Sequence, residues 1–272
     1  MRHFSILLCA CAALIVTPVM AADIPADILS EMKQADVVIL GEDHENAVHH
    51  QRQAQVVSDL SPSAMVWEMM TEQSASLVTA QLISEPEKMA ETIRWVEMGW
   101  PPLAMYLPIF AAAPDAPIYG AMVPRKALQA ALKSGAAAAL GADAARYGLN
   151  VSLPLEEQAA RELGQQAAHC GALPDDQLAN FVQMQRLRDA VLARAVLRAI
   201  DETDGPVVVI TGNGHARSDW GVPRLLARLA PGLKVVSLGQ SQDGQIEGEF
   251  DFVIDSPAVE RDDPCAVFSQ QD

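Results

Sequence analysis

The chain has 272 residues, of which half are hydrophobic, and a formal net charge of −16 at pH 7. This length and hydrophobic content allow a sizeable core in one large domain or two small ones. Excess acidic side chains repel a phosphate backbone, and no basic patch in the sequence offsets them, so we expect no nucleic-acid partner.

Residues 1–21 have the pattern of a secretory signal peptide. Arg2 precedes a short apolar run over residues 4–16, and a small-residue cleavage site ends at Ala21. The run is too short for a transmembrane helix. The pattern therefore predicts cleavage near Ala21 and an exported, periplasmic protein.

The rest of the chain, residues 22–272, shows no repeat and no low-complexity tract, so we expect a single domain. Cys9 and Cys11 lie inside the apolar run of the signal rather than after it, which argues against a lipid anchor. Cys170 and Cys265 then remain. In an oxidising compartment two such cysteines most often pair, and we expect a disulfide between them rather than a metal site.

Short apolar runs rich in β-branched residues alternate with longer helical patterns. Six strands are expected, the last with the polar and apolar alternation of an edge strand: 36–41, 64–68, 117–122, 206–212, 233–238 and 249–255. The expected helices are 44–60, 71–83, 102–113, 124–133, 155–169, 175–201 and 221–230. Residues 134–153 read as a loose connection or a small helical insert. The alternation predicts an α/β fold with a mostly parallel central sheet and helices on both faces.

Ionisable residues follow three of these strands, and this coincidence is the strongest signal in the sequence. Glu42 and His44 follow the first strand, Glu68 ends the second, and His215 follows the fourth. The carboxyl ends of parallel strands meet at one edge of a sheet, where ligands bind. Each strand end alone has an ordinary explanation as a turn or a helix cap. The three together favour a functional site.

Other residues are candidates for the same site. Arg125 follows the third strand, and Arg188 lies on a long helix from which its guanidinium could reach the carboxylates. His50 is as consistent with a helix surface as with the site. The aromatic and Met-rich segment from Trp100 to Phe110 reads first as core, although its prolines also suit a pocket wall. No G-x-S-x-G or H-E-x-x-H motif occurs in the sequence.

These residues resemble the ChaN family of haem-binding uptake proteins in the Tiki superfamily, and the resemblance runs from about residue 35 to residue 240. The matching pieces are Gly41-Glu42-Asp43-His44 with His50, Glu68, Pro124-Arg125, Gln185-x-x-Arg188-Asp189, Gly212-Asn213-Gly214-His215-Ala216-Arg217 and Gly221-Val222-Pro223.

The resemblance implies a Tiki/erythromycin-esterase-like fold in the cell envelope and haem bound at a homodimer interface. It also implies iron held by a tyrosine, for which Tyr147 and Tyr106 are the candidates, and a link to an outer-membrane haem uptake system. The ligand-binding set would be Glu42, His44, His50, Glu68, Arg125, Arg188, His215 and Arg217.

A second hypothesis comes from the superfamily, which also contains metal-dependent proteases and erythromycin-esterase-like hydrolases. In a hydrolase, Glu42 or Glu68 would be the general base, and His44 and His215 would bind a divalent transition metal or stabilise an oxyanion. A scaffold with a vestigial site is a third reading. We expect the haem-binding protein rather than the enzyme.

Overall fold

The structure is a computed structural model that describes residues 24–261 and 263–267. The predicted signal peptide, residues 1–21, lies outside this part of the chain. Within the described residues, no helix combines the length and the apolar character needed to cross a membrane.

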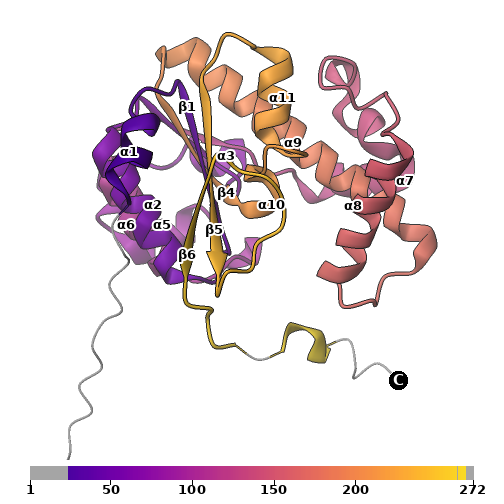
Figure 1. The fold of residues 1–272 in the computed structure, drawn as a ribbon. Helices are drawn as coiled ribbons and strands as arrows, with labels where there is room; N and C mark the ends of the chain where they lie inside the picture. Colours follow the sequence, from indigo (N-terminus) through magenta and orange to yellow (C-terminus); the bar gives the residue numbers. More distant parts are fainter. Residues whose placement is uncertain (1–23, 262, 268–272) are drawn as a thin grey trace, which may run out of the picture.

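One sheet of six parallel strands forms the centre of the molecule (Figure 1), in the order β3-β2-β4-β1-β5-β6. Each predicted strand is present, and the sixth lies at an edge as its alternating pattern indicates. The strands are β1 Val37–Glu42, β2 Ala64–Trp67, β3 Ile118–Gly120, β4 Val207–Gly212, β5 Val235–Gln242 and β6 Phe252–Ser256.

The central strands are apolar along their whole length because both faces of the sheet are covered. In β1, Val38 and Leu40 face one hydrophobic core, and Val37 and Ile39 face the other. Successive side chains of a strand point to opposite faces, so a continuous apolar run is what a doubly covered strand requires.

Helices cover the two faces in two groups. The first core is closed by α1 Ala26–Met32, α2 Ala47–Leu60, α3 Glu72–Ala75, α4 Ala80–Ile83, α5 Pro86–Thr92, η1 Val96–Met98, η2 Leu103–Met105 and α6 Leu107–Ala112. The second is closed by α7 Arg125–Leu140, α9 Asp175–Thr203 and α11 Val222–Leu229. The predicted α/β fold with helices on both faces is therefore confirmed.

Some element boundaries differ from the prediction because side chains cap the helices. The first long helix begins at Ala47 and not at residue 44, since the Asn46 side chain accepts a hydrogen bond from the N–H of Val48. The predicted helix 71–83 is two helices, because Thr71 and Thr79 each cap a separate one. The prediction did not include α1, α5 or the single turn α10 Asn213–Ala216.

The segment 134–153 is partly helical. Helix α7 continues as far as Leu140 through a break at Gly135, whose φ of 83° is favourable only for glycine. The 3-10 turn η3 Gly141–Asp143 follows, and α8 Leu155–Ala168 then packs against α9. Figure 1 shows α7 and α8 projecting together beyond one side of the sheet.

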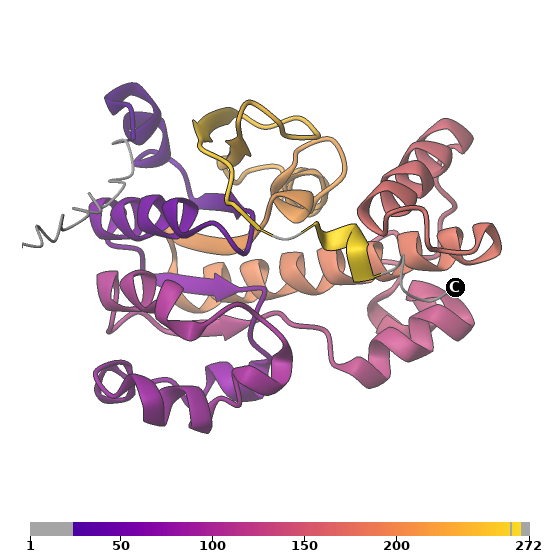
Figure 2. The same ribbon diagram turned by 90° about the horizontal axis from the view of Figure 1, so that it is seen from below.

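After β6 the chain crosses toward α8 and ends its described part in η4 Pro264–Val267, as Figure 2 shows. The predicted disulfide between Cys170 and Cys265 is present, with 5.4 Å between the two Cα atoms. It fastens the C-terminal tail to the turn between α8 and α9.

Candidate functional site

The carboxylate of Glu42 lies at the end of β1, with only 2% of the residue exposed. Its Oε1 is 2.7 Å from Nδ1 of His44 and accepts a hydrogen bond of 2.8 Å from the Tyr106 hydroxyl. The Nε2 of His50 lies 3.5 Å from the same oxygen. The end of β1, helix α2 and the turn before α6 therefore bring four polar groups together beneath the sheet edge.

Charge pairing fixes the protonation of this cluster. Burial alone would lower the pKa of His44, but its hydrogen bond to Glu42 and the charge of Glu68 raise that pKa to about 9. Burial would raise the pKa of Glu42, yet the two histidines hold it well below its usual range. Burial and Glu42 together raise the pKa of Tyr106. At neutral pH the cluster is thus an imidazolium, a carboxylate and a neutral phenol.

A second carboxylate, Glu68, lies directly after β2. Its Oε2 accepts hydrogen bonds from the Thr211 hydroxyl at 2.6 Å and from the Gly212 N–H at 2.8 Å. Its Oε1 is 3.6 Å from Nε2 of His215, whose Nδ1 donates to Asp189 at 2.6 Å. The imidazole of His215 thus lies between two carboxylates, those of Glu68 and Asp189. These three residues come from the end of β2, the one-turn helix α10 and the long helix α9.

His44 joins the two clusters, because its Nε2 lies 3.9 Å from Oε2 of Glu68. Although burial raises the pKa of Glu68 by itself, the charges of His215 and His44 bring it below its usual value. The pKa of His215 is raised by Glu68 and Asp189 against the opposing effect of burial. The two histidines therefore pair with the buried carboxylates internally.

Close backbone packing places His215. A Cβ on Gly41 would lie 2.4 Å from Oδ1 of Asn213, so only glycine fits there. The Asn213 side chain donates to the carbonyl of Gln240 at 2.9 Å and accepts from its N–H at 3.1 Å. This paired contact passes the end of β1 and ties the turn that carries His215 to β5.

His49, which lies beside His50 on α2, has a structural role. Its Nδ1 accepts from the N–H of Asp43 at 2.9 Å, so Nε2 carries the proton and donates to the Ser256 hydroxyl at 2.9 Å. Burial lowers its pKa to about 4. This ring is neutral at pH 7 and ties the loop after β1 to the end of β6.

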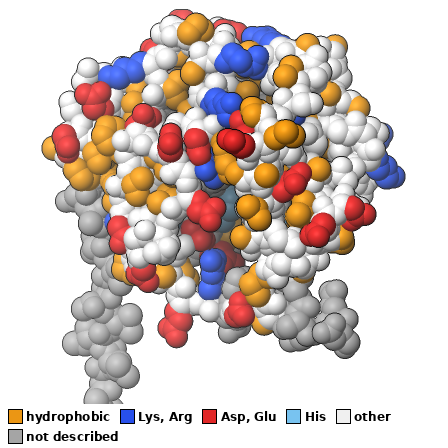
Figure 3. Space-filling model, turned by 45° about the vertical axis from the view of Figure 1, so that its right-hand side comes forward, with side chains coloured by type: hydrophobic (Ala, Val, Ile, Leu, Met, Phe, Trp, Pro, Cys, Tyr) orange, Lys and Arg blue, Asp and Glu red, His pale blue; other side chains and the backbone are white. Residues whose placement is uncertain are grey.

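Above the two clusters lies a cleft with a cavity volume of about 1120 Å³. Its lining includes Glu42, His44, Glu68 and His215, together with Arg125 and Arg188, and we call it the cleft from here on. Figure 3 shows a hollow in the surface with histidine at its floor and acidic and basic side chains around it. The apolar part of the wall is formed by Met98, Trp100, Met122 and Leu128.

Two of the predicted ligand-binding residues do not line this cleft. Arg217 pairs with Asp219 at 2.6 Å and stacks 3.7 Å from the ring centre of Trp220, which turns it into a smaller neighbouring cavity. His50 is buried beneath the cleft floor, with its ring centre 4.2 Å from that of Tyr106. The structure brings the other six predicted residues together.

The two tyrosine candidates lie in different places, and neither lines the cleft. Tyr106 is fully buried and donates to Glu42 from below. Tyr147, which is 3% exposed, lines a separate pocket of about 510 Å³. We call this the arginine pocket, because its lining includes Arg161, Arg186, Arg224 and Arg228.

Most guanidiniums of the arginine pocket hold the protein together. Arg161 and Arg224 share Oε1 of Glu157, at 2.6 and 2.9 Å. Arg186 donates to the carbonyls of Gly148 and Val151 at 2.7 and 2.8 Å. Arg224 thus joins α11 to α8, and Arg186 ties the loop before α8 to α9.

Three residues outside the predicted set of ligand-binding residues belong to the site. Asp189 was named only within the matching Gln185-x-x-Arg188-Asp189 motif, and its contact with His215 fixes its role. Trp100, whose ring centre is 4.8 Å from that of His44, came from a segment that reads first as core. Arg261 also lines the cleft, and no motif in the sequence pointed to it.

The donor set was also tested for a metal centre. Among residues 24–261 and 263–267, no group of three or more His, Cys, Asp or Glu side chains is arranged to hold a metal ion. Glu42, His44, Glu68 and His215 instead pair with one another, as the distances above show.

Comparisons with known proteins agree with the geometry. No curated protein matches the chain. A ChaN structure from Campylobacter jejuni, described as showing cofacial haem binding to that protein, is 17% identical and covers 84% of this chain and 89% of its own, with a TM-score of 0.61. The type III effector HopBA1 is 9% identical over 85% of this chain and 91% of its own, with a TM-score of 0.48. The family model described as haem-binding uptake, Tiki superfamily, ChaN matches residues 28–226. This match spans most of the sequence, and the chain therefore belongs to the ChaN family of the Tiki superfamily.

Proposed function

We propose that this chain is an exported haem-binding protein of haem or iron uptake, and that haem binds in the cleft at the carboxyl edge of the sheet. Membership of a family described by haem-binding uptake supports the ligand. The observation that supports this location is that Arg125 and Arg188, neither of which pairs with a carboxylate in the described part of the chain, lie beside an apolar wall in this cleft.

Haem is a flat apolar macrocycle with two carboxylates at one edge. Trp100, Met122 and Leu128 offer the macrocycle an apolar and polarisable surface. Arg188 donates to the amide oxygen of Gln185 at 3.1 Å rather than to a carboxylate, and Arg125 is exposed at the rim. Both guanidiniums are therefore available for charge-assisted hydrogen bonds to the haem carboxylates.

The proposal departs from the tyrosine ligand that the resemblance implies. All three tyrosines of the chain, Tyr106, Tyr119 and Tyr147, are more than nine-tenths buried, and the cleft is lined by none of them. Binding in the cleft rests on contacts to the macrocycle and its carboxylates, without an iron–phenolate bond.

A haemin titration followed by visible absorption tests the proposal. The wild-type chain should bind haemin saturably, and Arg125→Ala/Arg188→Ala should bind it about tenfold or more weakly, because two carboxylate contacts are lost. Arg224→Ala/Arg228→Ala, in the arginine pocket, is the matched control and should bind like the wild type. Absence of wild-type binding, or a loss confined to the control, would overturn the proposal.

Export is part of the proposal and has two supports. The first 21 residues have a signal-peptide pattern, and the Cys170–Cys265 disulfide suits an oxidising compartment. Cell fractionation should place the mature chain in the periplasmic fraction. The whole chain retained in the cytoplasm would contradict this part.

A homodimer is supported by apolar side chains exposed on and before α8. Val151, Leu155 and Leu163 are 63%, 89% and 72% exposed, which is unusual for a surface without a partner. Light scattering with and without haemin should detect the dimer. In such an assembly the protein would exchange haem with an outer-membrane uptake system.

The Asp189–His215 contact favours a second candidate, a hydrolase. A carboxylate that holds Nδ1 of an imidazole and leaves Nε2 facing a second carboxylate is an arrangement that acid–base catalysis uses. Glu42 or Glu68 would then activate water, and a divalent transition metal could assist at His44 and His215. Turnover of ester or peptide substrates that is lost in His215→Ala while haemin binding persists would establish it. Failure of every substrate with every such metal would exclude it.

A further inference from the structure

The chain beyond β6 is held to the sheet edge at several points. We call the described residues 257–261 and 263–267 the C-terminal strap. Its start is held by the Asn46 side chain, which donates to the carbonyl of Pro257 at 3.3 Å. The N–H of Val259 donates to the Gln242 side chain at 3.0 Å. The strap therefore begins as an ordered continuation of the sheet edge.

Within the strap, Arg261 reaches the cleft. It lines the cleft together with Ala168, near the end of α8. Its Nη1 lies 2.9 Å from Oε2 of Glu45 and 3.6 Å from Oδ1 of Asp43, and its side chain is 43% exposed. One guanidinium from the C-terminal end of the chain thus faces the two acidic side chains that flank His44.

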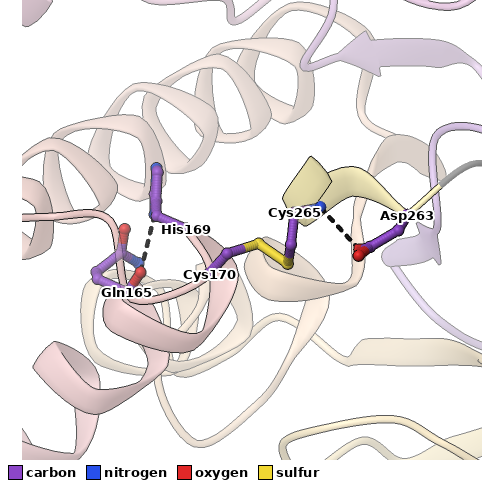
Figure 4. Close-up of a disulfide and its surroundings, with 5 residues drawn as sticks. All are labelled: Gln165, His169, Cys170, Asp263 and Cys265. Atoms are coloured by element: carbon purple, nitrogen blue, oxygen red, sulfur yellow. Dashed lines mark hydrogen bonds between the residues drawn. A yellow bond between two sulfur atoms is a disulfide. The ribbon is translucent and has the colours of Figure 1, made fainter. Parts of the chain in front are cut away.

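The Cys170–Cys265 disulfide links the strap covalently to the segment after α8. Cys170 follows Ala168 by two residues, and Cys265 follows Arg261 by four, so the bond joins the two segments that carry Ala168 and Arg261 to the cleft. Figure 4 shows the bond at the turn after α8, with the N–H of Cys265 donating to Asp263 at 2.9 Å.

We propose that Arg261 is a carboxylate-binding residue of the haem cleft, supplied by the C-terminal strap and kept in place by the Cys170–Cys265 bond. This inference rests on the proposed function. The strap lies beyond residue 226, where the family match ends.

The charges at the cleft mouth explain why such a residue is needed. Asp43, Glu45 and Glu97 line the mouth and would repel the carboxylates of an approaching haem. Arg261 neutralises two of them and keeps a guanidinium partly exposed toward the cleft. Together with Arg125 and Arg188 it makes the rim attractive to a dianion.

If the contacts of Arg261 with Asp43 and Glu45 served only to hold the strap, the expected effect of removing Arg261 would be the opposite. If Arg261 only latched the strap over the cleft, its removal would open the entrance and speed haem entry without weakening binding. If it binds a haem carboxylate, its removal leaves Asp43 and Glu45 uncompensated, and both association and affinity fall.

The test compares haemin with its dimethyl ester, in which the carboxylates are esterified. Arg261→Ala should lower haemin affinity about threefold to tenfold and slow association, while affinity for the ester stays unchanged. Arg261→Lys should recover part of the loss. Arg198→Ala is the matched control, since Arg198 is also half-exposed and also pairs with two carboxylates, Glu72 and Glu202.

The disulfide arm uses Cys170→Ser/Cys265→Ser, with folding checked by circular dichroism. It should reproduce the haemin defect of Arg261→Ala, and adding Arg261→Ala to it should cause little further loss. Unchanged or faster haemin binding by Arg261→Ala, or an equal loss for the ester, overturns the inference while the proposed function stands. Absence of haemin binding by the wild type overturns both.

Discussion

The cleft and the arginine pocket lie on either side of the same stretch of α9, and their charges are opposite. In the cleft, carboxylates outnumber arginines, yet Glu42 and Glu68 are buried and paired with histidines. In the arginine pocket, guanidiniums outnumber carboxylates, yet Arg161 and Arg186 are used to hold helices and a loop. The number of charges therefore does not identify a ligand site. A ligand site is identified by charges that are not used for internal contacts, or that stay partly exposed as Arg261 does.

The largest difference between the two regions should appear when the central carboxylate of each, Glu42 or Glu157, is removed and the loss of stability is compared. Glu42→Ala leaves His44 and the Tyr106 hydroxyl without their shared acceptor and removes the carboxylate beside His50, and we expect it to lower the free energy of unfolding by about 3–5 kcal/mol. Glu157→Ala should lower the free energy of unfolding by only about 1–2 kcal/mol, because Glu157 and its partner Arg224 are less buried than the Glu42 cluster. Urea denaturation measures both, and equal losses would show that the cleft floor is not the tighter network.

The two regions should also differ in how they respond to pH. The pKa of His44 is raised in the folded protein, so its stabilisation is complete below the ordinary value of 6.5 and is lost as the pH rises through about 9. The free energy of unfolding should fall by up to about 3 kcal/mol between pH 6 and pH 10. His44→Gln should reduce this dependence and leave the part that comes from the raised pKa of His215. Arginines do not titrate in this range, so Arg161→Ala should keep the wild-type dependence, and an unchanged slope in His44→Gln would contradict the assignment.

Substitution of the tyrosines should have the smallest effect on haemin affinity. It also distinguishes most clearly whether haem binds in the cleft or in the arginine pocket. Tyr147→Phe should change haemin affinity by less than about twofold, since its hydroxyl lies outside the cleft. Tyr106→Phe should lower stability by about 1 kcal/mol through the lost hydrogen bond to Glu42, with haemin affinity retained. Loss of the haem absorption band in Tyr147→Phe would instead place haem in the arginine pocket.

The sheet edge was predictable because parallel strands impose a common direction. Once β1 and β4 pair, Glu42 stands opposite Gly212, and the residues that follow each strand must meet. The sequence pattern therefore located Glu42, His44, Glu68 and His215 without knowledge of the side-chain contacts.

The remainder of the site depends on contacts that no local pattern records. Arg217 follows the same motif as His215, but its neighbours Asp219 and Trp220 turn it away. Arg261 reaches the rim through a disulfide between residues 95 positions apart. The burial of Tyr106 depends on the packing of α6 against α2, which the hydrophobic pattern alone does not specify.

The hydrogen bonds of the Asn213 amide should also affect how fast this residue deamidates. Asn213 precedes Gly214, and an Asn–Gly pair is the sequence most prone to deamidation because the glycine N–H can attack the side-chain carbonyl. Here the one-turn helix and the double hydrogen bond to Gln240 hold the amide away from that geometry. Deamidation would replace the donor that faces the Gln240 carbonyl with a negative oxygen. The rate at which this asparagine converts to aspartate thus reports how often the turn after β4 detaches from Gln240 on β5.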